Sequence, residues 1–276
     1  MLSRRRLLAA GAAVAGLSAA RAATATATLP IFDAHLHYSH DAWEQLPADA
    51  AAGLLRAAGL RAALVSSSSD EGTQRLLAAA PDLVRPSLRP YRRRGELGTW
   101  MHDASVITHL EDRLRAHRYV ALGEYHAYGE QADTAVVRRV VQLAREHGLF
   151  LHAHGDADAI ERQFRQDPQA RILWAHAGFD GPAAVDEMLR RHPTLCCDLA
   201  FRSDHASDGR VEPAWRALFL AHPERILVGT DTFTPERWHY VGEHARWSRA
   251  WLADLPPAVA EAIAWRNGER LFGLPR

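Results

Sequence analysis

Lysine is absent from this sequence: all 33 residues counted as lysine or arginine are arginine. They are balanced by 33 acidic residues, so the formal net charge at pH 7 is zero. A chain without excess positive charge lacks the long-range attraction that nucleic-acid-binding proteins use. We therefore expect a small-molecule substrate as the main partner, and no nucleic acid.

Cysteine is nearly absent as well, because the chain has only Cys196 and Cys197. Neighbours in sequence rarely form a disulfide, since the resulting ring is badly strained. The chain is therefore not a disulfide-stapled scaffold. Both residues suit a buried strand better than a thiolate metal site.

A long hydrophobic run is also missing. The apolar segment Ala9–Ala20 is shorter than the roughly 20 residues that a membrane span needs. Arginines at 4–6 precede it and small residues follow it, which predicts a signal peptide over 1–22 that resembles the twin-arginine type. A loose tether over 23–29 would follow. We expect a periplasmic or secreted protein without a stable membrane span after processing; an uncleaved anchor is the alternative.

Beyond the tether, short apolar runs alternate with amphipathic segments. We expect strands at residues 31–37, 61–66, 83–88, 119–125, 149–154, 171–176, 195–201 and 226–231. Helices are expected at residues 47–59, 74–80, 104–117, 134–147, 157–166, 182–191, 213–221, 235–252 and 257–272. Repeated strand–helix units indicate a parallel sheet, and eight of them predict a single (β/α)8 TIM barrel over 30–276. An open doubly wound sheet is the rival, but no Gly-x-Gly-x-x-Gly follows the first strand.

The first predicted strand carries two histidines. Side chains alternate between the faces of a strand, so Asp33, His35 and His37 are expected to share one face. Two imidazoles on one face can reach a single metal ion. On its own this pair is equally compatible with two solvated surface histidines.

The ends of other predicted strands supply further polar side chains. These are Glu124, His152 or His154, His176 and Asp231. The carboxyl ends of parallel barrel strands converge on one mouth, where barrel enzymes build their active sites. Separate buried imidazoles and carboxylates would each need a hydrogen-bond partner, whereas one shared cation satisfies them together. The pattern therefore predicts a metal site at the mouth.

Histidine and carboxylate ligands suit zinc, manganese, iron or cobalt, and zinc is the ion we expect. A catalytic site leaves a position for water, whose pKa falls from about 15.7 to about 7 on zinc. Asp231 is then the candidate for moving the proton to the leaving group. His176 would polarise the substrate carbonyl or act as a general acid or base.

Several short motifs, taken in order, carry a family resemblance. They are Asp33-Ala34-His35-Leu36-His37, His154, Ala175-His176-Ala177-Gly178 and Arg225-Ile226-Leu227-Val228-Gly229-Thr230-Asp231. The chain resembles the amidohydrolase superfamily, in the amidohydrolase-related branch that includes metal-dependent hydrolases, lactonases and decarboxylases. The resemblance implies that His35, His37, one histidine of the fifth strand and Asp231 are metal ligands, and that His176 is a further ligand or a catalytic group. On the fifth strand we favour His154, which lies nearer the mouth than His152.

The resemblance also bears on the number of metal ions. Many binuclear members use a carbamylated lysine on the fourth strand, which this lysine-free chain cannot provide. Glu124 resembles the branch that places a glutamate there, where it bridges a second metal, hydrogen-bonds a ligand or is structural. One or two ions are therefore expected. His126, one residue off the Glu124 face, is predicted to point away from the site.

Arginines and tryptophans of the mouth-side loops are candidates for substrate binding. Guanidinium groups match carboxylates and phosphates, so Arg92 and Arg202 predict an anionic substrate. Trp100 is expected to wall the pocket. The alternatives are a solvated charge run and ordinary packing.

We expect a metal-dependent hydrolase of a C–O or C–N bond, such as a lactone, ester or amide. The alternatives are a metal-dependent decarboxylase of the same branch, and a binding protein on a barrel that has lost catalysis. A broken ligand set would mark the last of these, but no expected ligand is missing. The sequence leaves the oligomeric state open.

Overall fold

The computed structural model describes residues 28–273. The predicted signal peptide, and all but the end of the predicted tether, lie outside this range. Within it, eight parallel strands form one sheet in which each strand pairs with the next along the chain. They are β1 (Ile31–His37), β2 (Leu60–Ser66), β3 (Val84–Leu88), β4 (Ala121–His126), β5 (Phe150–His154), β6 (Ile172–Trp174), β7 (Leu195–Asp198) and β10 (Ile226–Leu227).

The sheet curves round until its last strand meets its first. The backbone N–H of Ala34 donates to the carbonyl of Val228 at 2.8 Å, and the N–H of Asp231 donates to the carbonyl of His35 at 2.8 Å. These bonds bring the β10 end of the sheet against β1. The predicted parallel (β/α)8 barrel is therefore confirmed, with a nearly closed ring of strands.

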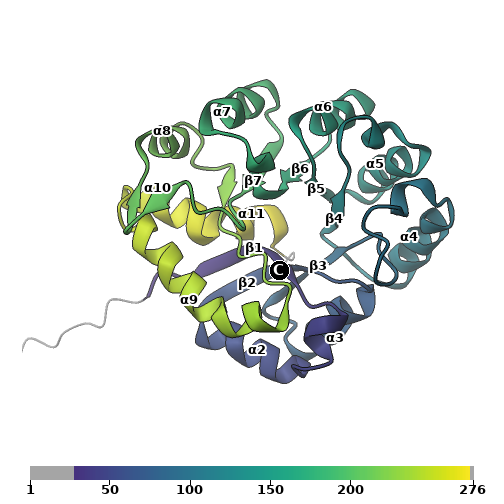
Figure 1. The fold of residues 1–276 in the computed structure, drawn as a ribbon, viewed down its shortest axis with the longest axis horizontal. Coiled ribbons are helices and arrows are strands. Elements are labelled where there is room, and N and C mark those ends of the chain that lie inside the picture. Colours follow the sequence, from purple (N-terminus) through teal and green to yellow (C-terminus); the bar gives the residue numbers. More distant parts are fainter. Residues whose placement is uncertain (1–27, 274–276) are drawn as a thin grey trace, which may run out of the picture.

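Helices α2 to α8 follow one another around the strands, and α9 completes the ring beside α2 (Figure 1). The α-helices are α1 (His40–Trp43), α2 (Ala48–Ala57), α3 (Asp70–Ala79), α4 (Ser105–Ala116), α5 (Ala135–His147), α6 (Ala157–Gln166), α7 (Pro182–Arg191), α8 (Pro213–Ala221), α9 (Pro235–Leu252), α10 (Pro257–Glu261) and α11 (Asn267–Phe272). Among the described residues, none of them combines the length and apolar character of a membrane span. Helix α5 shows why they form: the Thr134 side chain accepts the Val137 N–H, Gly148 ends the helix at φ 65°, and valines on one face are buried.

An apolar layer fills the barrel beneath its mouth. Phe32, Phe150 and Phe272 meet there, with ring centroids 6.0 Å apart for Phe32–Phe272 and 4.8 Å for Phe150–Phe272. Smaller buried side chains from the other strands complete the layer. The layer closes the barrel interior below the strand ends, where barrel enzymes build their active sites.

Some element boundaries differ from the prediction. Strands β7 and β10 end at Asp198 and Leu227, and the residues after them become mouth loops in which Phe201 and Asp231 have φ of 58° and 48°. An unpredicted antiparallel ribbon joins β8 (Ala206–Ser207) to β9 (Arg210–Val211). Asp208-Gly209 forms its turn, a pair that favours two-residue hairpins. The predicted helix over 257–272 is divided into α10, a π-helical turn and α11.

Candidate metal centre

Strand β1 delivers the two histidines at the centre of the site. The pairing of β1 with β2 shifts between Asp33 and Leu36, so strict alternation is interrupted. His35 and His37 are both buried, and their Nε2 atoms lie 3.1 Å apart. Asp33 turns instead to Thr230, accepting from its N–H at 3.0 Å and its hydroxyl at 2.6 Å. Asp33 thereby ties β1 to the loop after β10.

The hydrogen bonds of His37 fix its tautomer. Its Nδ1 lies 3.0 Å from the carbonyl oxygen of Ser66, and because a carbonyl only accepts, this nitrogen carries the proton. In the neutral ring, Nε2 therefore presents a lone pair. That lone pair faces Glu124 Oε2 at 3.2 Å and Asp231 Oδ1 at 3.3 Å. Such an arrangement is repulsive unless a positive charge, either a proton on the ring or a bound cation, lies between the three atoms.

A buried carboxylate from β7 holds the histidines from beneath. Asp198 Oδ2 lies 3.2 Å from His35 Nδ1 and 3.2 Å from His152 Nε2. Its other oxygen accepts the backbone N–H of His176 at 3.1 Å and that of Ala200 at 3.0 Å. Burial raises the pKa of Asp198, but the charge of His35 and these hydrogen bonds hold it well below its ordinary value. Burial lowers the pKa of His152 to about 4, so its ring is neutral and donates to Asp198.

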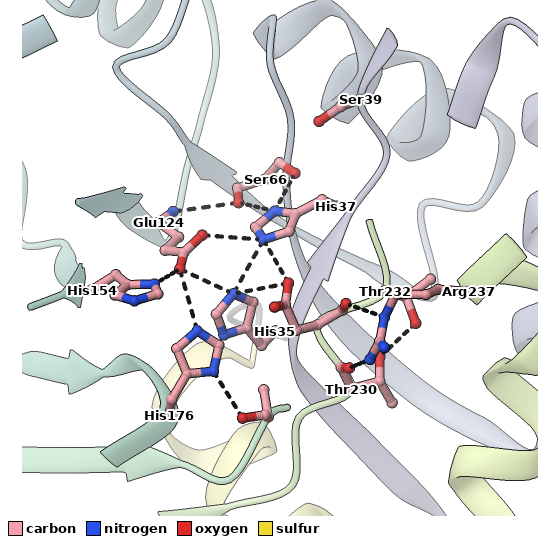
Figure 2. Close-up of polar contacts among 12 residues, drawn as sticks. His35, His37, Ser39, Ser66, Glu124, His154, His176, Thr230, Thr232 and Arg237 are labelled. Carbon is pink, nitrogen blue, oxygen red and sulfur yellow. Dashed lines mark hydrogen bonds and ion pairs between the residues drawn. The ribbon is translucent and has the colours of Figure 1, made fainter. Parts of the chain in front are cut away.

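Glu124 approaches from β4 and connects the remaining histidines (Figure 2). Arg89 donates to Oε2 at 2.7 Å, and His154 Nδ1 lies 2.7 Å from Oε1. His176 Nε2 lies 3.6 Å from the same oxygen, with Nδ1 donating to the Ala200 carbonyl at 2.8 Å. Burial raises the pKa of the Glu124 carboxyl, but the charge of His35 and the His154 hydrogen bond hold it well below the ordinary value.

Asp231 completes the group from the loop after β10. Its Oδ1 lies 3.3 Å from His37 Nε2 and 3.7 Å from His35 Nε2, and its side chain is 15% exposed. Arg237 fixes the loop by donating to the carbonyls of Asp231 at 2.8 Å and Thr230 at 2.6 Å (Figure 2). Burial raises the pKa of Asp231, but His35 and His37 lower it below its usual range.

The donor set fits a divalent cation. Ligand atoms of His35, His37 and Asp231 lie within 4.8 Å of one another, as do those of His35, Glu124 and His176. Ligand atoms on one zinc ion, bound at about 2.1 Å, lie roughly 3–3.5 Å apart, close to the separations seen here. Burial lowers the pKa of His35, but three carboxylates outweigh it and raise that pKa well above its ordinary value. The site therefore favours positive charge at its centre.

The structure brings the predicted ligands together in overlapping groups. His35 joins His37 and Asp231 in one group and Glu124 and His176 in another. His154 groups with Glu124 and His126, and His152 groups with His35 and Asp198. Whether each binds a metal stays a prediction.

The expectation that His126 points away is wrong. Its Nε2 lies 3.9 Å from Glu124 Oε1, and its ring stacks on His154 with centroids 4.1 Å apart. The pairing of β4 with β5 is irregular between Gly123 and Tyr125. Such a bulge re-aims the following side chains, which strict alternation cannot anticipate.

The predicted substrate-binding residues lie away from the main pocket. Trp100 is 1% exposed and donates its Nε1–H to the carbonyl of His126 at 2.9 Å. Arg92 pairs with Glu96 and Asp103. Arg202 pairs with Asp204 and borders a separate hollow. Each of the three is engaged by another part of the fold, and substrate contact by any of them stays a prediction.

The main pocket opens onto the candidate metal centre, since His37, Glu124 and Asp231 line it. Its volume is about 330 Å3, at the low end for small-molecule sites. The lining residues are His37, Ser39, His40, Asp41, Ser68, Arg89, Tyr91, Arg93, Arg94, Gly95, Glu96, Leu97, Glu124, His126, His154, Asp231 and Phe233. Two arginines of the loop after β3 thus line the pocket. They are Arg93 and Arg94, the neighbours of the predicted Arg92.

Sequence reasoning missed two residues that organise the site. The apolar pattern places Asp198 inside a longer strand over 195–201, whereas in the structure Asp198 is the polar residue that ends β7, as His154 ends β5. Arg89 follows β3 directly and neutralises Glu124. Both carry the strand-end signal that identified the other residues.

Comparison with known proteins defines the class. The family model described as "Amidohydrolase" matches residues 32–274, so the chain belongs to the amidohydrolase family, which is metal-dependent. A comparison with curated proteins gives no match.

Solved structures agree on the fold. A TIM-barrel protein from Bordetella bronchiseptica is 16% identical, with a TM-score of 0.59 over 88% of this chain and 98% of its own. A candidate 2-pyrone-4,6-dicarboxylic acid hydrolase from Pseudomonas putida is 18% identical, with a TM-score of 0.57 over 89% and 98%. A β-aspartyl dipeptidase from Fervidobacterium islandicum is 15% identical, with a TM-score of 0.54 over 88% and 72%.

Proposed function

We propose that this protein hydrolyses a C–O or C–N bond of a small lactone, ester or amide, using a divalent cation held by His35, His37 and Asp231. The observation that carries the proposal is the convergence of two histidine Nε2 atoms on one oxygen of Asp231, next to an open pocket. When bound, such a cation lowers the pKa of a water molecule and polarises a substrate carbonyl. Zinc is the ion we favour.

Asp231 is our candidate for proton transfer. Among the described residues its ion pairs with His35 and His37 involve Oδ1 only, which leaves Oδ2 for water or substrate. Its low pKa keeps it ionised at neutral pH, able to accept a proton. As the water oxygen bonds to the carbonyl carbon, Asp231 takes a proton from the water and then delivers it to the departing oxygen or nitrogen.

His176 is assigned a supporting role. Its Nδ1–H is engaged by the Ala200 carbonyl, so in the neutral ring its Nε2 offers a lone pair and no proton. This favours a further ligand position over donation to a substrate carbonyl. Glu124, held by Arg89, would share the same side of the site.

The test is product analysis on the zinc-loaded protein with lactones, esters, amides and aromatic carboxylates. We expect acid release that is lost on chelation and falls about 10²–10⁴-fold in Asp231→Asn, with an unchanged circular dichroism spectrum. Asp82→Asn, at an exposed carboxylate paired with Arg56, is the control and should retain activity. Carbon dioxide release without new acid would identify a decarboxylase instead, and binding without turnover would identify a binding protein.

A further inference from the structure

Large apolar side chains stand exposed around the mouth. We call them the apolar rim: Leu97 (51% exposed), Tyr128 (45%), Phe179 (52%), Phe201 (54%) and Phe233 (40%). Leu97 and Phe233 line the main pocket. Single exposed apolar residues are ordinary on a protein surface, but a group around one opening marks a binding surface.

The rim reaches the side chains of the metal centre. The Phe179 ring stacks on His176, with centroids 4.6 Å apart and planes at 13°. Tyr128 lies against His154, with ring centroids 5.9 Å apart. Aromatic side chains thus continue from the site histidines to the surface, so a ligand at the centre would meet them.

The other half of the rim is held from behind. The rings of Phe201 and Phe233 lie 6.4 Å apart. The Arg237 guanidinium lies over both, 4.7 Å and 5.8 Å from the ring centroids. Arg237 also fixes the Asp231 loop. This cation–π support orients the two rings beside the same carboxylate that faces the histidines.

The backbone of the rim is strained. Phe179 and Phe201 have φ of 57° and 58°, a left-handed conformation that bulky residues rarely adopt. Glycine would occupy it without a steric cost. Both residues therefore combine an unfavourable backbone conformation with an exposed aromatic ring. Neither feature stabilises the folded chain. Strain of this kind concentrates at functional sites.

We propose that the apolar rim binds an aryl group of the substrate, next to the carbonyl that is attacked. This inference rests on the proposed hydrolase function and names its substrate class: aryl esters, lactones or amides. Four of the five rim residues are aromatic, and aromatic rings pair favourably in stacked or edge-on contacts. The aryl group would lie between Phe179 and Phe233, above the metal centre.

Two metal-chelating probes separate the rim from the metal centre. Benzohydroxamate and acetohydroxamate carry the same chelating group and differ in a phenyl or a methyl substituent. On the zinc-loaded protein, isothermal titration calorimetry should show benzohydroxamate binding about tenfold or more tightly. In Phe179→Gly and Phe233→Ala this preference should shrink to about twofold, while acetohydroxamate affinity is retained. Leu220→Ala on α8, which also removes an exposed apolar side chain, should keep the full preference.

The outcomes distinguish the two proposals. Equal affinity for both probes in the wild-type protein would overturn the proposal that the apolar rim binds an aryl group. So would a preference for benzohydroxamate that survives in every rim variant. Either result would leave the proposed metal site standing. Failure of both probes on a protein that retains no zinc would overturn the hydrolase proposal, and the rim proposal with it. Self-association that buries the rim would also contradict a substrate role.

Discussion

At the scale of single residues, Asp198 shows how one buried carboxylate organises the imidazoles. Because Asp198 accepts from His35 Nδ1, the lone pair of the neutral His35 ring lies on Nε2, facing His37. In Asp198→Asn a donating NH2 group takes the place of one accepting carboxylate oxygen. If that group faces Nδ1, His35 no longer favours the tautomer with its proton on Nδ1. We expect zinc affinity to fall about 10–100-fold, the usual effect of removing a carboxylate that orients a ligand.

Competition with a chromophoric chelator measures that loss. Asp82→Asn, an exposed carboxylate paired with Arg56, is the matched control and should leave zinc affinity unchanged. Thermal unfolding of the metal-free proteins separates altered affinity from altered folding. Wild-type affinity in a folded Asp198→Asn variant would show that the hydrogen bond does not orient His35.

Phe201 allows the backbone strain of the rim to be measured. Phe201→Ala and Phe201→Gly remove the same ring, but only alanine keeps the Cβ that opposes φ of 58°. We expect the glycine variant to unfold with about 1 kcal/mol more free energy than the alanine variant. Urea denaturation provides the comparison. An alanine variant of equal or greater stability would mean that the left-handed backbone stores no strain here.

The sequence predicts a site residue well when that residue lies at a fixed place relative to a strand. His35, His37, His176 and Asp231 lie at or just beyond strand ends, and one-dimensional spacing is enough to bring them to one mouth. Arg92 and Trp100 occupy mouth-side loops too, yet their side chains are engaged by Glu96 and the His126 carbonyl. The contacts of loop side chains depend on the three-dimensional path of the loop, which sequence spacing does not reveal.

At the scale of elements, His205 is enclosed between the β8–β9 ribbon and helices α8 and α9. Its ring lies 4.9 Å from Trp251 and 5.1 Å from Trp247, centroid to centroid. Neither ring nitrogen has a hydrogen-bond partner among the described residues. Burial lowers the pKa of His205 to about 4.

This enclosure predicts a pH dependence of stability. Below the unfolded-state pKa of about 6.5 the unfolded chain binds a proton that the folded chain does not, so stability falls as the pH drops towards 4. The His205 contribution to this loss is at most about 3 kcal/mol. His205→Phe should flatten the curve of unfolding free energy between pH 6.5 and 4, whereas His102→Phe, at an exposed position, should not. Unchanged slopes in His205→Phe would contradict the assignment.

Element existence was easier to predict than element ends. Helices such as α6 and α7 begin at an N-cap aspartate or a first-turn proline and match their predicted bounds. Strands β7 and β10 proved shorter, because apolar composition continues into loops whose backbone turns left-handed. The bulge in β4 that re-aims His126 leaves no trace in hydrophobic periodicity.

At the scale of the whole molecule, the barrel depends on the packed layer beneath the mouth. A Cβ at Gly268 of α11 would lie 2.1 Å from Cγ of Phe32, so Gly268→Ala forces this layer apart. We expect a loss of about 1–3 kcal/mol in unfolding free energy. Gly53→Ala in α2 meets no atom within 4 Å and should be neutral or stabilising by about 0.5–1 kcal/mol. Urea denaturation measures both variants. Equal shifts of the urea midpoint in Gly268→Ala and Gly53→Ala would contradict the packing argument.

The order of the eight strands was predictable because regular alternation of strand and helix admits few topologies. The closure of β10 on β1 and the path of the β8–β9 ribbon depend on contacts between distant segments, such as Ala34 with Val228. These emerge only in the folded chain.

The central claim is that the clustered histidines and carboxylates hold a metal ion. Elemental analysis of metal per chain, on the wild-type protein and on the His35→Ala/His37→Ala variant, tests it most directly. We expect one or two equivalents of a transition metal, zinc foremost, in the wild-type protein and none in the variant. No metal in wild-type protein purified without chelators, and none regained on reconstitution, would contradict the claim and the proposed hydrolase with it.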